Sequence, residues 1–200
     1  MKVGIVGGTF NPIHNGHIDM ATHAYVNHGL DDILILPSGN PPHKDQQDLL
    51  DGSDRFEMCL LACMDHDHLL VESLELERKG TTYTIDSLQY YNDVYHLKDS
   101  LYYIIGGDTV LQLTSWREYQ KVFKACRFIA FLRKGFDNDE ILQCAEDLKK
   151  KFSLDIVFDE TEIPDISSTD IRNRVRNKQS IKELVPERVE KYIYEHGLYK

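Results

Sequence analysis

The sequence of 200 residues lacks several features that would place a protein in a familiar class at once. Its four cysteines, Cys59, Cys63, Cys126 and Cys144, form no C-x-x-C pair. We therefore expect buried thiols rather than a disulfide or a zinc site. No apolar run approaches the ~20 residues of a membrane span, and the first residues do not have the pattern of a signal peptide. These absences predict a cytoplasmic protein that does not bind a membrane.

Positive charge is also scarce, with 23 Lys and Arg against 33 Asp and Glu, for a net charge of −10. This balance argues against nonspecific binding to nucleic acid or to an anionic membrane. The histidines outside the first motif, such as His66 and His68, do not have zinc-ligand spacing, so we expect no metal held by the protein itself. Length and composition predict a single domain over residues 1–200, with a helical portion from about 165 to 200.

Short apolar runs rich in β-formers alternate with helical patterns along the whole chain, which predicts an α/β fold with a Rossmann-like, doubly wound parallel sheet and C-terminal helices. The expected strands are Lys2–Val6, Asp32–Pro37, Leu69–Glu72, Leu101–Ile105, Arg127–Leu132 and Asp155–Phe158. The expected helices are Gly16–His28, Asp54–Met64, Thr84–Tyr95, Thr109–Gln112, Tyr119–Phe123, Asn138–Phe152, Ser168–Asn177 and Pro186–Tyr194. Ligands of such folds bind at the carboxyl ends of the strands, so motifs at strand ends carry the most information.

The most informative stretch is the first strand with the turn and helix that follow it. An apolar run, Val3–Val6, leads into Gly7-Gly8-Thr9-Phe10 and then into the expected helix. Glycines at a strand end let the backbone approach a ligand closely, and a helix start offers free N–H groups to an anion. His14 and His17 add two donors at the same helix entrance. The stretch predicts a site that handles phosphate.

The glycines fit neither G-x-G-x-x-G nor G-x-x-x-x-G-K-[ST]. Instead, His14-Asn15-Gly16-His17 resembles the H-x-G-H signature of the nucleotidylyltransferase superfamily. The eleven-residue string GGTFNPIHNGH, from Gly7 to His17, resembles the bacterial nicotinate mononucleotide adenylyltransferases. Further motifs resembling that family follow in order at Pro41–Lys44, Thr82–Leu88, Gly106–Trp116 and Ile166–Arg172. One departure is Asn11, where many relatives carry Asp; we expect no loss of activity from it.

Each of the later motifs can also be interpreted as a purely structural feature that binds no ligand. Residues 37–44 fit a surface loop, and Thr84 and Ser167 fit ordinary helix caps. Trp116 also fits a core position, although an aromatic plate with a nearby amide donor suits a flat heteroaromatic acid. Arg133 fits a solvated strand end as well as it fits a phosphate contact. Their recurrence with the first motif favours the functional interpretation.

The resemblance implies transfer of AMP from ATP to nicotinate mononucleotide, giving deamido-NAD and pyrophosphate in NAD biosynthesis. Its implied catalytic residues are His14, His17, Lys44 and Arg172. Its implied ATP-binding residues are Gly7, Gly8, Thr9, Phe10, His14, His17, Gly106, Asp108, Ile166, Ser168, Thr169 and Arg172. Its implied mononucleotide-binding residues are Asn40, Lys44, Thr82, Thr84, Trp116, Arg117 and Arg133. Mg²⁺ is expected to arrive with ATP, since it prefers phosphates and water to an all-protein cage.

Such a transfer needs no activated nucleophile, because the attacking phosphate oxygen is already ionised. It needs positioning and positive donors, so donors from the first motif and from the Ser-Ser-Thr helix should converge across one cleft. Two alternatives remain open. One is another transferase of the superfamily, using nicotinamide mononucleotide, pantetheine phosphate or a cytidylyl donor. The other is a noncatalytic nucleotide-sensing module. A homo-oligomer is compatible with the sequence.

Overall fold

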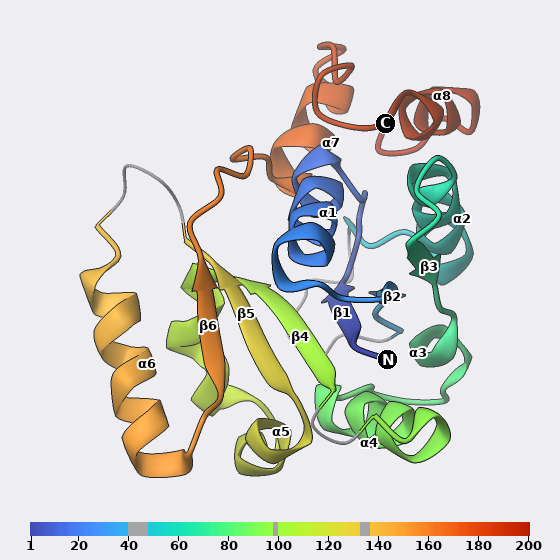
Figure 1. Ribbon diagram of the computed structural model, residues 1–200. Helices are drawn as coiled ribbons and strands as arrows, with labels where there is room; N and C mark the ends of the chain where they lie inside the picture. The colour runs from blue at the N-terminus through green and yellow to red at the C-terminus, as the bar shows by residue number, and fades with distance from the viewer. Residues whose placement is uncertain (40–47, 98–99, 133–136) are drawn as a thin grey trace.

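The computed structural model describes residues 1–39, 48–97, 100–132 and 137–200, and its strands form one parallel sheet (Figure 1). The strand order across this six-stranded sheet is β3-β2-β1-β4-β5-β6. The strands are β1 (Val3–Gly8), β2 (Asp32–Pro37), β3 (Leu69–Val71), β4 (Leu101–Gly106), β5 (Arg127–Phe131) and β6 (Ile156–Asp159). The doubly wound α/β class and all six predicted strands are confirmed, with ends that differ by one or two residues.

Helices connect the strands. They are α1 (Asn15–His28), α2 (Gly52–Cys63), α3 (Leu74–Glu77), α4 (Thr84–Tyr95), the 3₁₀ helix η2 (Gly107–Ser115), α5 (Tyr119–Ala125), α6 (Asp139–Phe152), α7 (Ser168–Arg176) and α8 (Glu187–Glu195). Two features differ from the sequence prediction. The expected short helix Thr109–Gln112 is the longer 3₁₀ helix η2, and α3 was not predicted because its four residues are too few to show helical periodicity.

The sheet is buried on both faces, as parallel sheets usually are. Successive side chains of a strand point to opposite faces, so the neighbours Ile5 and Val6 of β1 belong to two separate apolar clusters. The cluster around Val6 packs under α1, α2, α7 and α8, and the cluster around Ile5 packs under α4, α5, η2 and α6. These two layers explain why the strand sequences read as continuous apolar runs.

β1 lies in the middle of the sheet, between β2 and β4. Val3 pairs with Asp32 on one side and with Leu101 on the other. From β1 the chain runs outward through β2 to β3 at one edge of the sheet. It then returns to the other side of β1 to form β4, so the direction of winding reverses between β1 and β4. Ligands of open α/β sheets bind at the carboxyl ends of strands at such a reversal. The topology alone therefore points to the end of β1 near Gly8.

The C-terminal helices α7 and α8 lie next to α1 and α2, beyond the carboxyl end of β1 (Figure 1). The Tyr192 hydroxyl of α8 donates to the Asp54 carboxylate of α2 at 2.9 Å.

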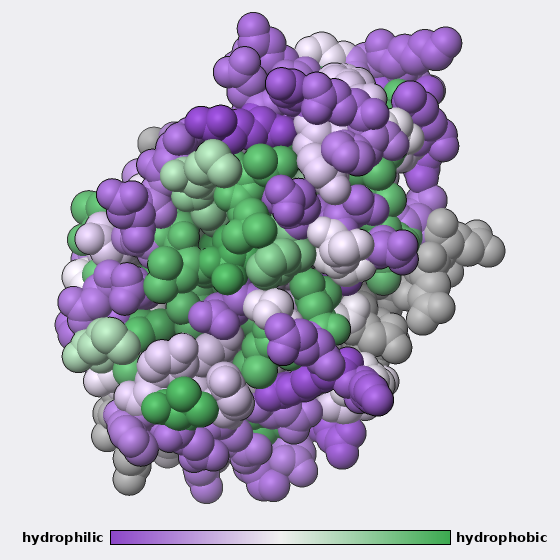
Figure 2. Space-filling model, turned by 90° about the vertical axis from the view of Figure 1, so that its right-hand side faces the viewer, coloured by the Kyte–Doolittle hydropathy of each residue, from purple (hydrophilic) through white to green (hydrophobic). Residues whose placement is uncertain are grey.

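Figure 2 shows one side of the molecule, where apolar side chains gather below hydrophilic ones. The exposed apolar residues include Leu60 of α2, Met64 directly after it and Leu70 of β3. Among the described residues, no helix combines the length and apolarity needed to cross a bilayer.

Candidate active site

A cavity of about 330 Å³ opens at the carboxyl ends of β1 and β4, where the winding of the sheet reverses. Its walls come from β1, α1, β4, η2, the end of β5 and the segment that precedes α7. The residues predicted from sequence that line it are Gly7, His14, His17, Gly106, Asp108, Trp116 and Ile166. Four of the five predicted motifs lie in described residues, and three of these contribute directly to this one cavity.

The turn after β1 is tightly packed, which accounts for its glycines. A Cβ on Gly7 would lie 2.1 Å from the Tyr103 hydroxyl, and a Cβ on Gly8 would lie 2.9 Å from the Phe10 ring. Phe10 itself is buried and packs edge-on against His17, with ring centroids 5.0 Å apart. Thr9 is also buried. Gly8, Thr9 and Phe10 do not line the cavity; they support the residues that do.

His14 and His17 stack on one another at the start of α1, with ring centroids 3.6 Å apart and planes 24° apart. The His14 backbone N–H donates to Nδ1 of His17 at 3.2 Å. Because Nδ1 accepts, the proton of a neutral His17 ring is assigned to Nε2. Burial lowers the pKa of His14 to about 4, so His14 is neutral at pH 7. The pair therefore offers N–H donors to the cavity without a fixed charge on His14.

Hydrogen bonds join the first motif to the Ser-Ser-Thr helix, α7. The Ser168 hydroxyl donates to the Pro12 carbonyl at 2.8 Å, and Arg172 Nη1 donates to the Asn11 carbonyl at 2.9 Å. Arg172 Nη2 donates to the Thr169 hydroxyl at 3.2 Å, while its buried Nε has no hydrogen-bond partner among the described residues. The two segments therefore meet, as predicted. Ile166 lines the cavity, whereas Ser168, Thr169 and Arg172 do not, so the convergence of their donors across one cleft stays a prediction.

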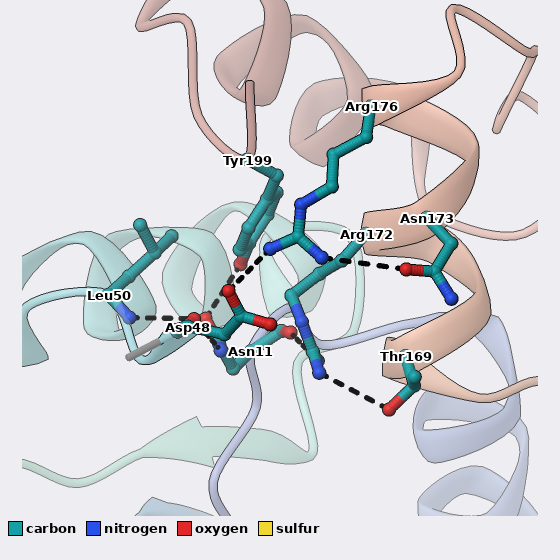
Figure 3. A network of polar contacts seen from close by, with 8 residues as sticks. All are labelled: Asn11, Asp48, Leu50, Thr169, Arg172, Asn173, Arg176 and Tyr199. Atoms are coloured by element: carbon teal, nitrogen blue, oxygen red, sulfur yellow. Dashed lines mark hydrogen bonds and ion pairs between the residues drawn. The ribbon is translucent and has the colours of Figure 1, made fainter. Parts of the chain in front are cut away.

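Asn11 is the centre of a polar network that Figure 3 shows from close by. Its side-chain oxygen accepts from the Tyr199 hydroxyl at 3.0 Å and from the Leu50 N–H at 3.4 Å. Its amide nitrogen donates to the Asp48 carbonyl at 2.8 Å, and the Asp48 carboxylate pairs with Arg176. An Asp at position 11 would place an acceptor against the Asp48 carbonyl. The surroundings of Asn11 therefore fit an amide, which explains the departure from the family pattern.

The two segments predicted to bind the pyridine ring also meet. Trp116 lines the cavity and contacts Tyr103 edge-on, with ring centroids 5.6 Å apart. The Arg117 guanidinium lies over the Tyr83 ring, 4.4 Å from the ring centroid. Tyr83 is the residue between Thr82 and Thr84. Thr82 is buried, and Thr84 begins α4. Arg117 is exposed and does not itself line the cavity.

At η2, a Cβ on Gly106 would lie 2.8 Å from the Asp108 carboxylate, so the glycine leaves room for that side chain at the cavity wall.

Asn40, Lys44 and Arg133 lie outside the described residues. In the described part of the chain, no group of three or more His, Cys, Asp or Glu side chains could hold a metal ion.

Comparison with known proteins agrees with this geometry. The model of the family described as cytidylyltransferase-like matches residues 5–174. A protein of Clostridium novyi named "Probable nicotinate-nucleotide adenylyltransferase" is 37% identical over 199 residues, covering 100% of this chain and 99% of the relative. A protein of the same name from Thermoanaerobacter is 38% identical over 202 residues, with 100% and 95% covered. The chain belongs to the cytidylyltransferase-like family, among its nicotinate-nucleotide adenylyltransferases.

Solved structures share the family fold at lower identity. The Plasmodium falciparum nicotinic acid mononucleotide adenylyltransferase complexed with NaAD superposes with a TM-score of 0.77 at 22% identity, covering 99% of this chain and 97% of that one. The same enzyme complexed with APC gives a TM-score of 0.76 at 21% identity, covering 99% and 96%. These likenesses establish the family fold for the whole chain.

Sequence reasoning missed several residues around the site. Tyr103 of β4 lines the cavity and touches Gly7, but it reads as an ordinary strand residue. Arg55 is buried on the apolar face of α2, and a charged residue at an apolar position was the signal that could have revealed it. Tyr199 contacts Asn11 and Glu75 contacts Gly39, each far away in sequence, and nothing in the local pattern indicates those contacts.

Proposed function

We propose that this chain transfers AMP from ATP to nicotinate mononucleotide, giving deamido-NAD and pyrophosphate. Family membership over the whole chain supports the reaction class, and the names of the relatives support the acceptor. The single observation that carries the proposal is the cavity at the reversal of the sheet. There the His14–His17 pair, the Ile166 segment and Trp116 line one space.

In the proposed reaction, an oxygen of the mononucleotide phosphate attacks the α-phosphorus of ATP. The bond from that phosphorus to the bridging oxygen of the β-phosphate breaks, and pyrophosphate leaves with the electron pair. No protein base is required, because the attacking oxygen is ionised. Charge grows around the α-phosphate, and preorganised donors stabilise it. The Nε2–H of His17 and an N–H of His14 supply such donors, since both rings line the cavity.

The other proposed phosphate-binding residues come from α7 and from the segment that follows β2. We propose that Ser168, Thr169 and Arg172 receive the β- and γ-phosphates. Asn40 and Lys44 are proposed to face the phosphates from their loop. Gly7 lines the proposed ATP site and is supported by Gly8, Thr9 and Phe10, while Gly106 and Asp108 line the side that we assign to the nucleoside of ATP.

We propose that the pyridine ring stacks on Trp116 and that its carboxylate meets Thr84 and the Arg117 backbone N–H. Thr82 supports this seat from its buried position, and Arg133 remains a candidate for the phosphate. The contact of Arg117 with Tyr83 brings these segments together, as a seat built from both requires. The seat predicts preference for nicotinate over nicotinamide mononucleotide, because the two ligands differ in that carboxylate.

The proposal includes Mg²⁺, which enters bound to the phosphates of ATP. It also places residues 1–200 in one domain that acts in the cytoplasm, where the four free cysteines would stay reduced.

The decisive experiment measures pyrophosphate release from Mg–ATP with each pyridine mononucleotide in turn. We expect rapid release with nicotinate mononucleotide, slower release with nicotinamide mononucleotide, and deamido-NAD as the product of the first reaction. Equal use of both mononucleotides would contradict the carboxylate seat. Binding of ATP without release of pyrophosphate with either mononucleotide would overturn the proposed reaction and favour a nucleotide sensor.

A further inference from the structure

Arg55 of α2 is a buried charge that lies between two turns of the site. Only 1% of it is exposed, and it has no ion-pair partner among the described residues. Its Nη1 donates to the carbonyls of Thr9 at 2.8 Å and Ser38 at 2.7 Å, and its Nη2 donates to the Gly39 carbonyl at 3.3 Å. Its Nε donates to the Leu50 carbonyl at 3.2 Å. One guanidinium therefore ties together the chain that leaves β1, the chain that leaves β2 and the start of α2.

Glu75 of α3 is a buried carboxyl, and it lies beside the same glycine. The residue is 8% exposed, and the Ser87 hydroxyl donates to its carboxylate at 2.8 Å. Burial raises the pKa of this carboxyl, and the hydrogen bond from Ser87 opposes that shift. Glu75 therefore connects α3 with α4, which contains Ser87 and begins at Thr84.

Gly39 itself has no room for a side chain. A Cβ at this position would lie 2.0 Å from the Glu75 carbonyl oxygen and 3.3 Å from the Thr82 methyl carbon. The backbone at the end of β2 thus touches α3 and the segment before α4 directly. Any shift of Gly39 changes the distance between the chain leaving β2 and the pyridine seat at Thr82–Thr84.

We propose that Arg55 and Glu75 are positioning residues for the mononucleotide half of the site: Arg55 holds the carbonyl of Gly39, the Glu75 backbone packs against Gly39 while its carboxyl accepts from Ser87 of α4, and together they fix the end of β2 against Thr82. Neither residue lines the cavity. The inference rests on the proposed function, because it assigns the mononucleotide to the side of Thr82. It also predicts an asymmetry, since Glu75 touches only that side whereas Arg55 also holds Thr9 in the turn after β1.

The first test is Glu75→Gln, which keeps size and one acceptor oxygen but replaces the second carboxyl oxygen with an amide nitrogen, a donor, beside the Ser87 hydroxyl. We expect the KM for nicotinate mononucleotide to rise about tenfold, which corresponds to the loss of one buried hydrogen bond. The KM for ATP and kcat should stay within about twofold. Glu77→Gln is the matched control, because Glu77 lies on the same helix and is exposed. It should leave both KM values unchanged.

The second test is Arg55→Lys, which keeps the charge but cannot reach four carbonyls with one ammonium group. We expect higher KM values for both substrates, because Thr9 and Gly39 are released together. The control is Arg188→Lys on the exposed face of α8. Gly39→Ala displaces the glycine without changing either charge, and it should reproduce the Glu75→Gln pattern. Thermal denaturation of every variant checks that it is folded under the assay conditions.

The outcomes separate this inference from the proposed function. If the unchanged protein releases no pyrophosphate with any mononucleotide, the proposed function fails. If it is active but Glu75→Gln and Gly39→Ala leave the KM for the mononucleotide unchanged, the positioning inference fails and the reaction stands. Equal increases in both KM values for folded Glu75→Gln would also overturn the inference, because general loosening has no preference for one substrate.

Discussion

At the scale of single residues, the chemistry depends on which ring nitrogens of the histidine pair carry protons. The His14 backbone N–H occupies Nδ1 of His17, so the donor of His17 is at Nε2. The stacked rings and the edge of Phe10 restrict rotation of His17, which keeps that donor in one direction. A preorganised donor needs no reorientation when charge develops on the phosphate, and this is the source of its catalytic value.

His17→Ala removes this donor, and we expect kcat to fall by roughly 100- to 1000-fold, as for the deletion of an oxyanion-hole donor. Pyrophosphate release is the measurement. His23→Ala, on the same helix but away from the cavity, is the control and should keep its rate. A folded His17→Ala variant with a near-normal rate would refute the role of the donor.

His14 should make the protein sensitive to mild acid. The folded-state pKa of about 4 is below the ordinary value of 6.5, so protonation favours the unfolded chain. This contribution to stability is complete above pH 6.5 and is lost as the pH falls toward 4, by up to about 3 kcal/mol. Urea unfolding at pH 7, 5 and 4 should therefore show a steeper loss for the natural protein than for His14→Gln. Parallel losses would contradict the burial of a neutral His14.

Residue-scale prediction from sequence succeeded where a local motif carries the signal. His14, His17 and Trp116 were identified from short strings and line the cavity. Arg55 and Tyr103 were missed because their importance comes from contacts with Thr9 and Gly7, which are distant in sequence. A local pattern contains no information about such partners.

At the scale of elements, the site depends on how closely β1 and β4 approach at their carboxyl ends. Gly7 of β1 faces Tyr103 of β4, and the space for a methyl group on Gly7 is taken by the Tyr103 hydroxyl. The Tyr103 ring also contacts Trp116 edge-on, with ring centroids 5.6 Å apart. One buried tyrosine therefore connects the phosphate turn to the pyridine seat.

Gly7→Ala should force these strands apart and cost about 1–3 kcal/mol of stability, as overpacked cores do. Tyr103→Phe removes the clashing oxygen, so the double variant Gly7→Ala/Tyr103→Phe should recover part of that loss. Thermal unfolding of the two single variants and the double variant measures the coupling. Strictly additive effects would show that the two side chains do not compete for the same space.

The elements themselves were largely predictable. Apolar runs of β-formers located the strands, and α4 matches its predicted ends of Thr84 and Tyr95. The errors are in short or unusual elements. α3 has only four residues, and η2 has the 3₁₀ form, which the pattern Thr109–Gln112 does not distinguish from a short α-helix. The parallel direction of the strands also followed from the alternation of strands and helices, but their order in the sheet was not predicted.

At the scale of the whole molecule, the Asn11 network joins segments from both halves of the chain. The Tyr199 hydroxyl reaches Asn11 across 188 positions of sequence, and Arg176 reaches Asp48 across 128 (Figure 3). Contacts of such separation could not be read from the sequence. The helical portion from about 165 to 200 was predicted, but its support of the turn after β1 was not.

Tyr199→Phe tests this connection, because it removes only the hydroxyl. The Asn11 oxygen would keep the longer bond from Leu50, so we expect a loss of about 1 kcal/mol in unfolding free energy. For a chain of this length, the melting temperature should fall by about 2–4 °C. Tyr194→Phe is the control, since that ring is 44% exposed. An equal fall in melting temperature for Tyr199→Phe and Tyr194→Phe would show that the loss does not come from the hydrogen bond to Asn11.

The hydrogen bond from Ser168 to Pro12 has a consequence for synthesis in the cell. A growing polypeptide completes the turn after β1 among its first residues, but the opposite wall, Ile163–Ile166, is added more than 140 positions later. A ribosome-bound nascent chain therefore contains the turn after β1, the proposed phosphate site, long before the opposite wall of the cavity has been synthesised.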